Sequence, residues 1–335
     1  QRSKREIVMQ VLVVGGAGYI GSHMVKLLCQ RGFEVTVLDN LSAGYRDAVT
    51  GGRFVLGDLG ELDVLDDLLT TRRFDGVMHF ASHIQVGESV REPAKYYRNN
   101  VFKTQRLLDA MVAHRVRCFI FSSTAAIFGE PVRLPIDEAH PKNPINPYGR
   151  GKWMVEQMLQ DYDVAYDLKA VCLRYFNAAG ADPDGELGER HQPETHLIPL
   201  VLRAAAGRLP QVTVFGTDYD TPDGACIRDY IHVNDLCEAH LLALQRLWDG
   251  GDSAAYNLGN GNGFSVREVI ETARAVTGRA IPVRYGERRA GDPARLVADS
   301  RRARAELGWE PRYADLATII AHAWRWETGN GEGRR

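Results

Sequence analysis

A glycine array that follows a short apolar run constrains this chain more than any other feature. Residues 10–15 (QVLVVG) have the pattern of a buried strand, and Gly15, Gly18 and Gly21 then recur at every third position where a helical pattern begins. Glycines in this arrangement permit a tight turn, a close approach of the backbone to a pyrophosphate, and close packing of a helix on a strand. The start of the helix adds amide donors and a positive dipole. The array therefore predicts a dinucleotide-binding α/β fold.

An acidic residue downstream narrows the choice of cofactor. Asp39 stands 18 residues beyond Gly21 and ends the second strand-like run, residues 34–39. A carboxylate at this place accepts hydrogen bonds from the adenosine ribose hydroxyls and repels a 2′-phosphate. We therefore expect NAD rather than NADP. Asp58 ends the third run and could accept a hydrogen bond from the adenine amine, although a simple turn aspartate is the alternative.

The first half of the chain alternates strand-like and helix-like segments. The strand-like runs are continuously apolar, as parallel strands covered on both faces require. They are residues 10–15, 34–39, 53–58, 76–80, 118–123 and 170–176. Helical patterns lie between them at residues 23–31, 62–70, 93–114 and 147–161. This order predicts a Rossmann-like, doubly wound parallel sheet.

The rhythm changes after about residue 178. A loop rich in glycine, proline and acidic residues covers residues 180–193, and short strands then mix with helices. Ser265 and Glu268 form a capping-box pattern at the start of one of these helices. We expect an NAD-binding Rossmann domain at residues 9–177 and a smaller, mixed α/β substrate domain at residues 178–330, with some chain crossing between the two.

Composition excludes several classes of protein. The formal net charge of -2 offers no basic excess for nucleic acid or a membrane surface. The five cysteines form no CxxC pair, so neither a metal site nor a redox dithiol is indicated, and we expect free thiols in a reducing cytoplasm. No run approaches the ~20 apolar residues that are needed to span a bilayer.

A tyrosine and a lysine in the motif NPYGRGK are candidate catalytic residues. Tyr148 and Lys152 lie four residues apart, which places them on one face of a helix that Asn146 can cap and Pro147 can begin. Tyrosine becomes a base near neutral pH only if its pKa of about 10 falls by several units. A partly buried ammonium about 4 Å away can supply an effect of that size. The pattern Y-x-x-x-K is often a chance surface pair, but the upstream glycines and the strand-end hydroxyls of residues 122–124 favour a catalytic one.

Several motifs occur in a fixed order along nearly the whole chain. From Gln10 to about Glu327 they are GGAGYIGSH, LDNLSAG, HFAS, VGESV, YYRNNV, FSSTAAIFG, NPYGRGK, LRYFNAAGADP, IRDYIHVNDL, YNLGNG and RRAGDP. On these motifs the chain resembles the extended short-chain dehydrogenase/reductase family, and within it the 4-epimerases of UDP-glucose and UDP-galactose. The resemblance implies that Tyr148 is the acid/base at the sugar 4-hydroxyl, that Lys152 lowers its pKa and holds the nicotinamide ribose, and that Thr124 hydrogen-bonds the 4-oxygen.

The resemblance also implies a reaction and two sets of binding residues. Hydride would leave C4 for the nicotinamide and return to the other face of a 4-keto sugar, so NAD would stay bound. The cofactor residues are Gly15, Gly18, Tyr19, Ile20, Gly21, Asp39, Asn40, Asp58, Leu59, Phe80, Ala81, Asn99 and Phe176. The UDP-sugar residues are Asn177, His196, Leu197, Phe215, Arg228, Arg289, Asp292 and Leu296. The two arginines suit a diphosphate clamp. The resemblance implies no metal. It does imply a homodimer that forms through residues 93–114 and 147–161.

Three positions depart from the family pattern. Thr124 stands where many members carry serine, Ile84 where some carry a lysine near the cofactor diphosphate, and His196 where asparagine is frequent. NPINPYG and RDYIHV also resemble pentose 4-epimerases, so a UDP-pentose such as UDP-arabinose or UDP-xylose stays open. These departures concern the substrate contacts more than the type of reaction.

Leu296, four residues past Asp292, matches a family position beside the sugar 2-substituent. The resemblance implies that the size of the residue there limits which 2-substituent fits. In the family a bulky tyrosine there restricts the pocket to plain hexoses, and a small cysteine or serine admits N-acetyl groups. Leucine is intermediate in volume and offers no hydrogen bond to an acetamide. We therefore expect UDP-glucose and UDP-galactose to be preferred over UDP-N-acetylhexosamines, with simple core packing of Leu296 as the alternative.

Two other functions fit parts of the pattern. A nucleotide-sugar 4,6-dehydratase shares the fold and the first hydride step, but related dehydratases carry Asp-Glu after the threonine, where this chain has Ala125 and Ala126. An inert NAD-sensing module could dispense with Tyr148 and Lys152, and both are present. The resemblance therefore implies an NAD-dependent 4-epimerase of UDP-glucose and UDP-galactose, with a UDP-pentose or UDP-N-acetylhexosamine 4-epimerase as the alternative.

Overall fold

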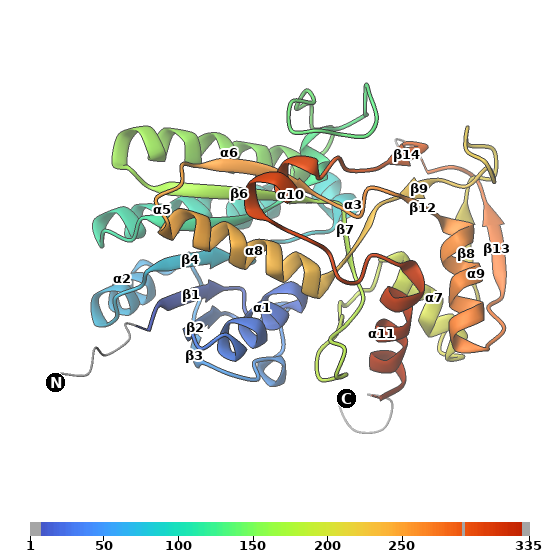
Figure 1. The fold of residues 1–335 in the computed structure, drawn as a ribbon, viewed down its shortest axis with the longest axis horizontal. Coiled ribbons are helices and arrows are strands. Elements are labelled where there is room, and N and C mark those ends of the chain that lie inside the picture. The colour runs from blue at the N-terminus through green and yellow to red at the C-terminus, as the bar shows by residue number, and fades with distance from the viewer. Residues whose placement is uncertain (1–7, 290–291, 330–335) are drawn as a thin grey trace.

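Seven parallel strands form the central sheet of the computed structural model, which describes residues 8–289 and 292–329 (Figure 1). The order across the sheet is β11-β6-β5-β4-β1-β2-β3. These strands are β1 (Gln10–Val14), β2 (Glu34–Asp39), β3 (Arg53–Leu56), β4 (Gly76–His79), β5 (Cys118–Thr124), β6 (Lys169–Tyr175) and β11 (Ala254–Leu258). The order reverses between β1 and β4, which is where open sheets of this kind bind ligands. The predicted Rossmann-like, doubly wound fold is confirmed.

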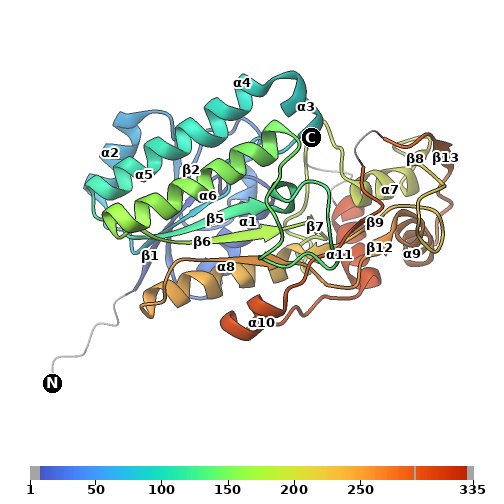
Figure 2. The ribbon, with the colours of Figure 1, turned by 90° about the horizontal axis from the view of Figure 1, so that it is seen from above.

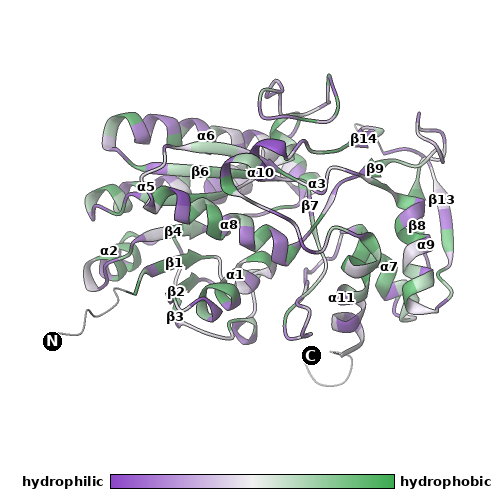
Figure 3. Cartoon of the chain, in the orientation of Figure 1, coloured by the Kyte–Doolittle hydropathy of each residue, from purple (hydrophilic) through white to green (hydrophobic). Residues whose placement is uncertain are grey.

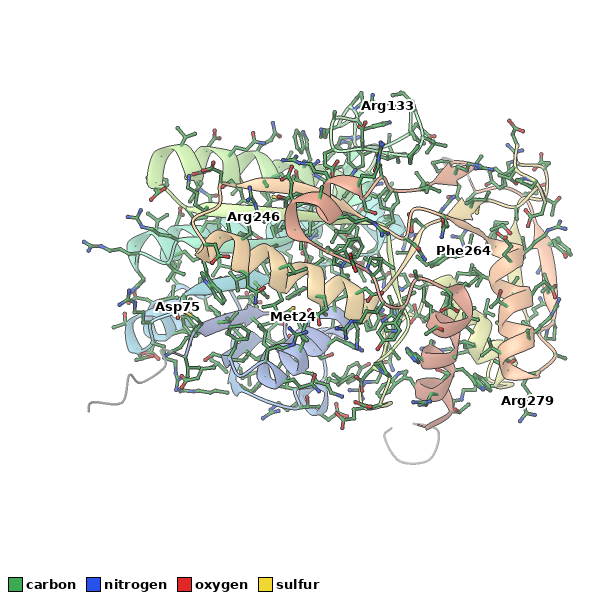
Figure 4. The ribbon with its side chains drawn as sticks, viewed as in Figure 1. Met24, Asp75, Arg133, Arg246, Phe264 and Arg279 are labelled. Atoms are coloured by element: carbon green, nitrogen blue, oxygen red, sulfur yellow. The ribbon has the colours of Figure 1, made fainter. Side chains whose placement is uncertain are left out.

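Helices cover both faces of this sheet (Figure 2). On one face lie α1 (Tyr19–Gln30), α8 (Val233–Trp248) and α10 (Arg301–Leu307), and on the other α2 (Leu62–Thr71), α5 (Lys103–Ala113) and α6 (Pro147–Tyr166). Alternate residues of β1 enter two separate cores: Val11 and Val13 join the first, and Leu12 and Val14 the second. All four are fully buried, which explains why this strand is continuously apolar. Met24, labelled in Figure 4, lies where α1 packs on α8.

The remaining elements form a smaller part beyond the carboxyl end of β6 (Figure 1). Its core is made by α7 (Leu197–Ala205), α9 (Val266–Thr277), α11 (Leu316–Gly329) and β8 (Val212–Phe215), which pairs with β13 (Val283–Gly286). In Figure 3 both α9 and α11 change between green and purple, as amphipathic helices with one buried face do.

Two short ladders stand apart from the seven-stranded sheet. They join β7 (Asn177–Ala179) to β10 (Tyr230–His232), and β9 (Ile227–Arg228) to β12 (Phe264–Ser265) and β14 (Arg295–Leu296). The chain also returns from the smaller part to the sheet, because α8 packs on α1 and β11 pairs with β6. The division into residues 9–177 and 178–330 stays a prediction, and α8 and β11 are the elements that cross it.

Several helix bounds differ from those expected. The helix expected at 23–31 begins at Tyr19, directly after its N-cap Gly18. The segment 93–114 is not one α-helix: it consists of α4 (Pro93–Tyr96), a π-helical turn η2 (Tyr97–Phe102) and α5. Helix α6 continues to Tyr166 and ends at Asp167 in a left-handed conformation. The periodicity of apolar residues alone did not resolve these ends. The other short helices are η1 (Arg46–Ala48), α3 (Val86–Arg91) and η3 (Ala125–Ile127).

Both predicted caps are confirmed. The side chain of Asn146 accepts a hydrogen bond of 2.8 Å from the Gly149 N–H at the start of α6. Ser265 and Glu268 form the reciprocal capping box of α9. Among the described residues, no helix is long and apolar enough to cross a membrane.

Candidate active site

The carboxyl ends of β1, β4, β5 and β6 meet at one edge of the sheet, because these strands are parallel neighbours. Predicted site residues stand at or directly after each of these ends: Gly15, Phe80, Thr124 and Phe176. The register pairs Thr124 with Tyr175, so Thr124 and Phe176 come from adjacent strand ends. The topology thus gathers residues that are far apart in the sequence.

The glycine array is tightest at its two ends. Gly15 has φ of 82°, and a Cβ there would lie 2.5 Å from the Ala81 nitrogen. A Cβ on Gly21 would overlap the carbonyl oxygen of Gly15. At Gly18, in contrast, an added Cβ would have the Gly15 oxygen as its nearest neighbour, 3.5 Å away. The chain itself therefore leaves space in front of the middle glycine.

The start of α1 has amide donors without a side-chain cap. Its N-cap is Gly18, no side chain caps it, and no acidic residue lies in its first turn. The first amides of a helix have no intrahelical partner, and together with the helix dipole they attract an anion. The uncapped amides and the space at Gly18 fit the diphosphate of a dinucleotide such as NAD.

The side chains of three predicted cofactor residues contact other parts of the protein. The Tyr19 hydroxyl donates a hydrogen bond of 2.7 Å to the Gly180 carbonyl. Ile20 packs against the core between α1 and the sheet, and Leu59 is buried in the core on the opposite face. From Tyr19 and Ile20, the backbone amides are the groups that a diphosphate could reach.

Asp39 closes the glycine loop. Its carboxylate accepts hydrogen bonds from the Ala17 N–H (2.9 Å) and the Leu41 N–H (2.8 Å). Leu41 follows with φ of 58°, so the chain turns sharply after β2. The predicted ribose-binding carboxylate therefore stands at the end of β2 in a fixed orientation, beside the loop that fits the diphosphate.

Asp58 belongs to a polar group that the sequence did not indicate. Its carboxylate accepts hydrogen bonds from the Lys103 ammonium (2.6 Å), the Asn40 amide (2.7 Å) and the Gly60 N–H (2.6 Å). Burial by itself would raise the pKa of Asp58, but Lys103 and the other donors hold this pKa below its usual value. Asp58 is thus a charged acceptor, and a lysine 45 residues away keeps it so.

The segment after β4 is held by the π turn. The side chain of Asn100 bonds both the N–H and the carbonyl of His83, each at 2.9 Å, and Asn99 donates to Asn100 at 3.0 Å. π turns occur frequently at functional sites. The ring of Phe80 lies 5.0 Å from that of His240 on α8. Asn99 and Phe80 therefore stand on anchored backbone, and their contacts with the cofactor stay predictions.

The hydroxyl of Thr124 lies beside the Tyr148 side chain and acts to lower the pKa of its phenol. Burial raises the pKa of Tyr148, and the Thr124 hydroxyl opposes this only in part. In the chain alone the tyrosine loses water on burial, and the ammonium of Lys152 hydrogen-bonds Ser82 and Ser122. The lowering of this pKa by Lys152 beside bound NAD stays a prediction.

Lys152 is almost fully buried, at 3% exposure. Its ammonium donates hydrogen bonds to the Ser82 hydroxyl (2.7 Å) and the Ser122 carbonyl (2.8 Å), and it lies 4.7 Å from the centre of the Phe121 ring. Burial lowers the pKa of Lys152 to about 7, although Glu156 works in the opposite direction. Near neutral pH this side chain can therefore either hold or release a proton.

A buried ion pair supports the same helix one turn further on. Glu156 on α6 accepts hydrogen bonds from Arg174 on β6 (2.6 Å) and from the Ser123 hydroxyl on β5 (2.5 Å). The side chains of this pair are only 2% and 5% exposed. The pair fixes α6, which carries Tyr148 and Lys152, against the two strands. The sequence signal that could have found it is the glutamate four residues after Lys152.

Four predicted substrate residues meet as two pairs. Arg228 forms an ion pair with Asp292 and donates a hydrogen bond of 2.9 Å to the Pro293 carbonyl. The guanidinium of Arg289 lies 4.0 Å from the centre of the Phe215 ring. Each arginine is thus held by the chain itself, and the diphosphate clamp stays a prediction.

Asp229 organises the substrate side and was not predicted. Its fully buried carboxylate accepts hydrogen bonds from the N–H groups of Asn260 (2.6 Å), Gly261 (3.1 Å) and Ala298 (3.0 Å). Its carbonyl accepts from the amide of Asn177 at 2.9 Å. One side chain therefore fixes the predicted substrate residue Asn177 relative to two later segments.

The remaining substrate residues lie in two places. Leu296 is the β14 partner of Arg228, and it packs with Ala125 and Phe176 on a small apolar cluster. His196 is the N-cap of α7, directly before Leu197. Burial by itself would lower the pKa of His196, but ion pairs with two glutamates raise it to about 10.

The fold and the site together define a class of protein. A sheet of this order, a glycine loop at its point of reversal, and a tyrosine and a lysine on α6 beside a strand-end threonine are the features of an NAD-binding dehydrogenase/reductase-type enzyme.

Comparison with known proteins gives the particular family. The model of the NAD dependent epimerase/dehydratase family matches residues 11–259. A UDP-glucose 4-epimerase of Halalkalibacterium halodurans is 53% identical over 97% of both chains. A crystal structure of a UDP-glucose 4-epimerase has a TM-score of 0.96 and 51% identity, and the match covers 97% of this chain and 99% of that one. The Brucella ovis enzyme in complex with NAD has a TM-score of 0.93 and 54% identity, with 95% and 98% covered.

The chain therefore belongs to the NAD dependent epimerase/dehydratase family and, within it, to the UDP-glucose 4-epimerases.

Proposed function

We propose that this protein interconverts UDP-glucose and UDP-galactose by inversion at C4, with NAD held as a cofactor that is not consumed. The observation that carries the proposal is the position of Tyr148 on α6 beside the strand-end Thr124, with Lys152 one turn along the same helix. This group stands at the carboxyl edge of the sheet, where the uncapped start of α1 fits a dinucleotide. Family membership supports both the reaction and the cofactor.

The chain's own residues supply proton transfer and positioning. Tyr148 takes the proton of the sugar 4-hydroxyl, and Thr124 hydrogen-bonds the same oxygen. NAD, held by the uncapped start of α1 and by Asp39, would supply the acceptor for hydride from C4 and the donor for its return to the opposite face of the sugar. Because burial raises the pKa of Tyr148 in the chain alone, the site needs added positive charge for the phenolate to form. The protonated form of Lys152 and the oxidised cofactor are the two sources of such charge.

Elimination of water is disfavoured by the residues after Thr124. Ala125 and Ala126 begin the η3 turn there, and the Ala126 N–H donates a hydrogen bond of 3.1 Å to the Thr124 hydroxyl oxygen. A 4,6-dehydratase needs a further acid and base at the sugar, and neither alanine can transfer a proton. The site therefore favours epimerisation over dehydration.

The test is turnover of pure UDP-galactose, with UDP-glucose, UDP-N-acetylhexosamines and UDP-pentoses run in parallel. We expect formation of UDP-glucose without added NAD and without net reduction of the cofactor. A 4-keto-6-deoxy product would instead indicate the dehydratase, and absence of turnover with every substrate would indicate an inert NAD-binding module.

We also propose a homodimer through η2, α5 and α6. Phe102 and Met154 lie on these elements and are 48% and 42% exposed, which is high for large apolar side chains. Light scattering should give twice the mass of the chain. Met154→Glu should shift the protein toward monomer, whereas Val132→Glu, at a 72% exposed position outside these three elements, should not.

A cytoplasmic location is the last part of this proposal. It is supported by the five cysteines, all of which are free thiols. Thiols of this kind persist in reducing compartments. Cell fractionation with a tagged full-length protein would test it.

A further inference from the structure

Two histidines and two glutamates converge outside the proposed catalytic group. Glu189, His191, Glu194 and His196 lie in the loop between β7 and α7, and one ligand atom from each falls within 4.8 Å of the others. In Figure 1 this loop is the yellow-green segment between α1 and α11. No residue of this cluster has a role in proton transfer or in binding the dinucleotide, and only His196 is a predicted substrate residue.

The side chains already contact one another through the atoms that bind metals. The Nδ1 atom of His191 lies 2.8 Å from Glu189 Oε1, and Nδ1 of His196 lies 2.8 Å from the same oxygen and 2.9 Å from Glu194 Oε1. The carboxylates are only 6% and 1% exposed. The protein therefore buries two negative charges at this place and directs two imidazoles at them.

One oxygen of the cluster accepts no hydrogen bond. Glu194 Oε2 is buried on a side chain that is 1% exposed, and its charged neighbour, His191 Nδ1, lies 4.0 Å away, too far for a hydrogen bond. An ionised carboxylate that is shielded from water normally accepts several hydrogen bonds, because a buried unpaired acceptor costs about 1–3 kcal/mol. The histidine N–H groups therefore leave one acceptor site of the Glu194 carboxylate without a hydrogen bond.

We propose that Glu189, His191, Glu194 and His196 bind one divalent transition-metal ion of the Zn²⁺ type. Imidazole nitrogen and carboxylate oxygen both bind Zn²⁺ at about 2.0–2.2 Å, and four such ligands make a closed, tetrahedral structural site. Adjacent ligand atoms in such a site stand about 3.3–3.6 Å apart. On metal binding the Nδ1 protons would leave, the atoms that now stand 2.8–2.9 Å apart would separate, and those up to 4.8 Å apart would approach. Ca²⁺ and Mg²⁺ fit less well because they prefer ligand sets made only of oxygen.

The position of the loop indicates what the metal does. The loop is tied to both parts of the molecule: Asp182 pairs with Lys26 of α1 at 2.8 Å, and the Glu189 carbonyl accepts from Trp326 of α11 at 3.3 Å. His196 begins α7, and the ring of His191 packs edge-on against Tyr19 at 6.1 Å. The ion stabilises this loop between the glycine-loop helix and the substrate side. It takes no part in hydride or proton transfer.

Metal binding is tested first on the wild-type protein with its dinucleotide bound. The protein is stripped with a chelator, dialysed and titrated with Co²⁺ alone. We expect one Co²⁺ per chain with the intense visible absorption of four-coordinate cobalt, and Zn²⁺ should abolish this absorption by displacement. Failure to bind Co²⁺ or Zn²⁺ stoichiometrically overturns the proposal, and this measurement does not depend on any variant folding or on epimerase activity.

Variants locate the ion. His191→Gln and Glu194→Gln should each weaken Co²⁺ binding by more than about tenfold, the lower end of the effect seen when even a supporting residue of a metal site is lost. The matched control is His114→Gln, which removes a histidine paired with Asp66 at 2.7 Å far from the loop in sequence. Its Co²⁺ spectrum should match that of the wild type. If the glutamine variants in the loop bind as tightly as the wild type, the ion lies elsewhere and the proposal is wrong.

Discussion

The ammonium of Lys152 lies 2.8 Å from the carbonyl oxygen of Ser122, so α6 is tied to β5 two residues before Thr124. The lysine is therefore positioned by the strand and by Ser82, not by Tyr148. This arrangement keeps the lysine, the threonine and the tyrosine in a constant relationship at the carboxyl edge of the sheet. The predictions below start from it.

Replacing Tyr148 by phenylalanine should remove proton transfer and leave the binding of the UDP-sugar largely unchanged. We expect kcat to fall by about 10²–10⁴, the usual contribution of a general acid or base, with KM changed only a few-fold. Steady-state kinetics with UDP-galactose measures both. Tyr162→Phe on the same helix is the control, because that hydroxyl bonds Asp109 at the surface. Activity of the Tyr148 variant within twofold of wild type would exclude this tyrosine from the mechanism.

The hydroxyl of residue 124 should matter more than its methyl group. Thr124→Ser keeps the hydroxyl beside Tyr148 and its hydrogen bond from the Ala126 N–H, so its activity should be close to that of the wild type. Thr124→Val has nearly the same shape without the hydroxyl, and we expect a loss of at least about tenfold in kcat/KM, or about 1.4 kcal/mol. Equal activity in the two variants would show that the hydroxyl has no catalytic part.

Lys152 should make stability depend on pH. Because burial lowers its pKa from 10.5 to about 7, the unfolded chain holds the proton more firmly than the folded chain between these values. The free energy of unfolding should therefore rise with pH across this window, by at most about 1.4 kcal/mol per unit from this group. Urea unfolding of cofactor-stripped protein at several pH values measures the slope. Lys152→Met should have a smaller slope, and identical slopes would contradict the depressed pKa.

Substitutions at two glycines of the loop between β1 and α1 should have different effects on folding and on cofactor binding. Gly18→Ala has room within the chain, since the nearest atom to the new Cβ is 3.5 Å away. It should keep its melting temperature when cofactor-free but retain less NAD, because the methyl group enters the space that fits the diphosphate. Gly21→Ala instead overlaps the Gly15 carbonyl and should lower the melting temperature itself. Calorimetry and release of NAD by acid distinguish the two effects.

Leu296 should restrict the substrate. We expect a preference for UDP-glucose and UDP-galactose over UDP-N-acetylhexosamines of roughly 10- to 100-fold in kcat/KM, because an acetamide pressed on leucine loses water without gaining a partner. Leu296→Ser should reduce this ratio. If the wild type uses both substrate classes equally, or if serine leaves the ratio unchanged, Leu296 only fills the cluster that it shares with Phe176.

The sequence by itself determined the structural features that depend on residues close to one another in the chain. The apolar run of β1, the cap from Asn146 to Gly149 and the capping box of Ser265 are local, because their free energies involve residues a few positions apart. The glycine array followed by Asp39 likewise predicted the order of strand, turn and helix. From these the doubly wound sheet follows, since parallel strands joined by helices have few ways to pack.

Only the tertiary structure decided which distant groups meet. Lys152 finds Ser82 across 70 positions and Lys103 finds Asp58 across 45, and no periodicity relates such pairs. The raised pKa of Tyr148 also required the fold, because desolvation depends on everything that surrounds a group. The histidine–glutamate cluster lies within eight residues of chain, but these residues are irregularly spaced. Only the conformation of the loop between β7 and α7 brings their ligand atoms together.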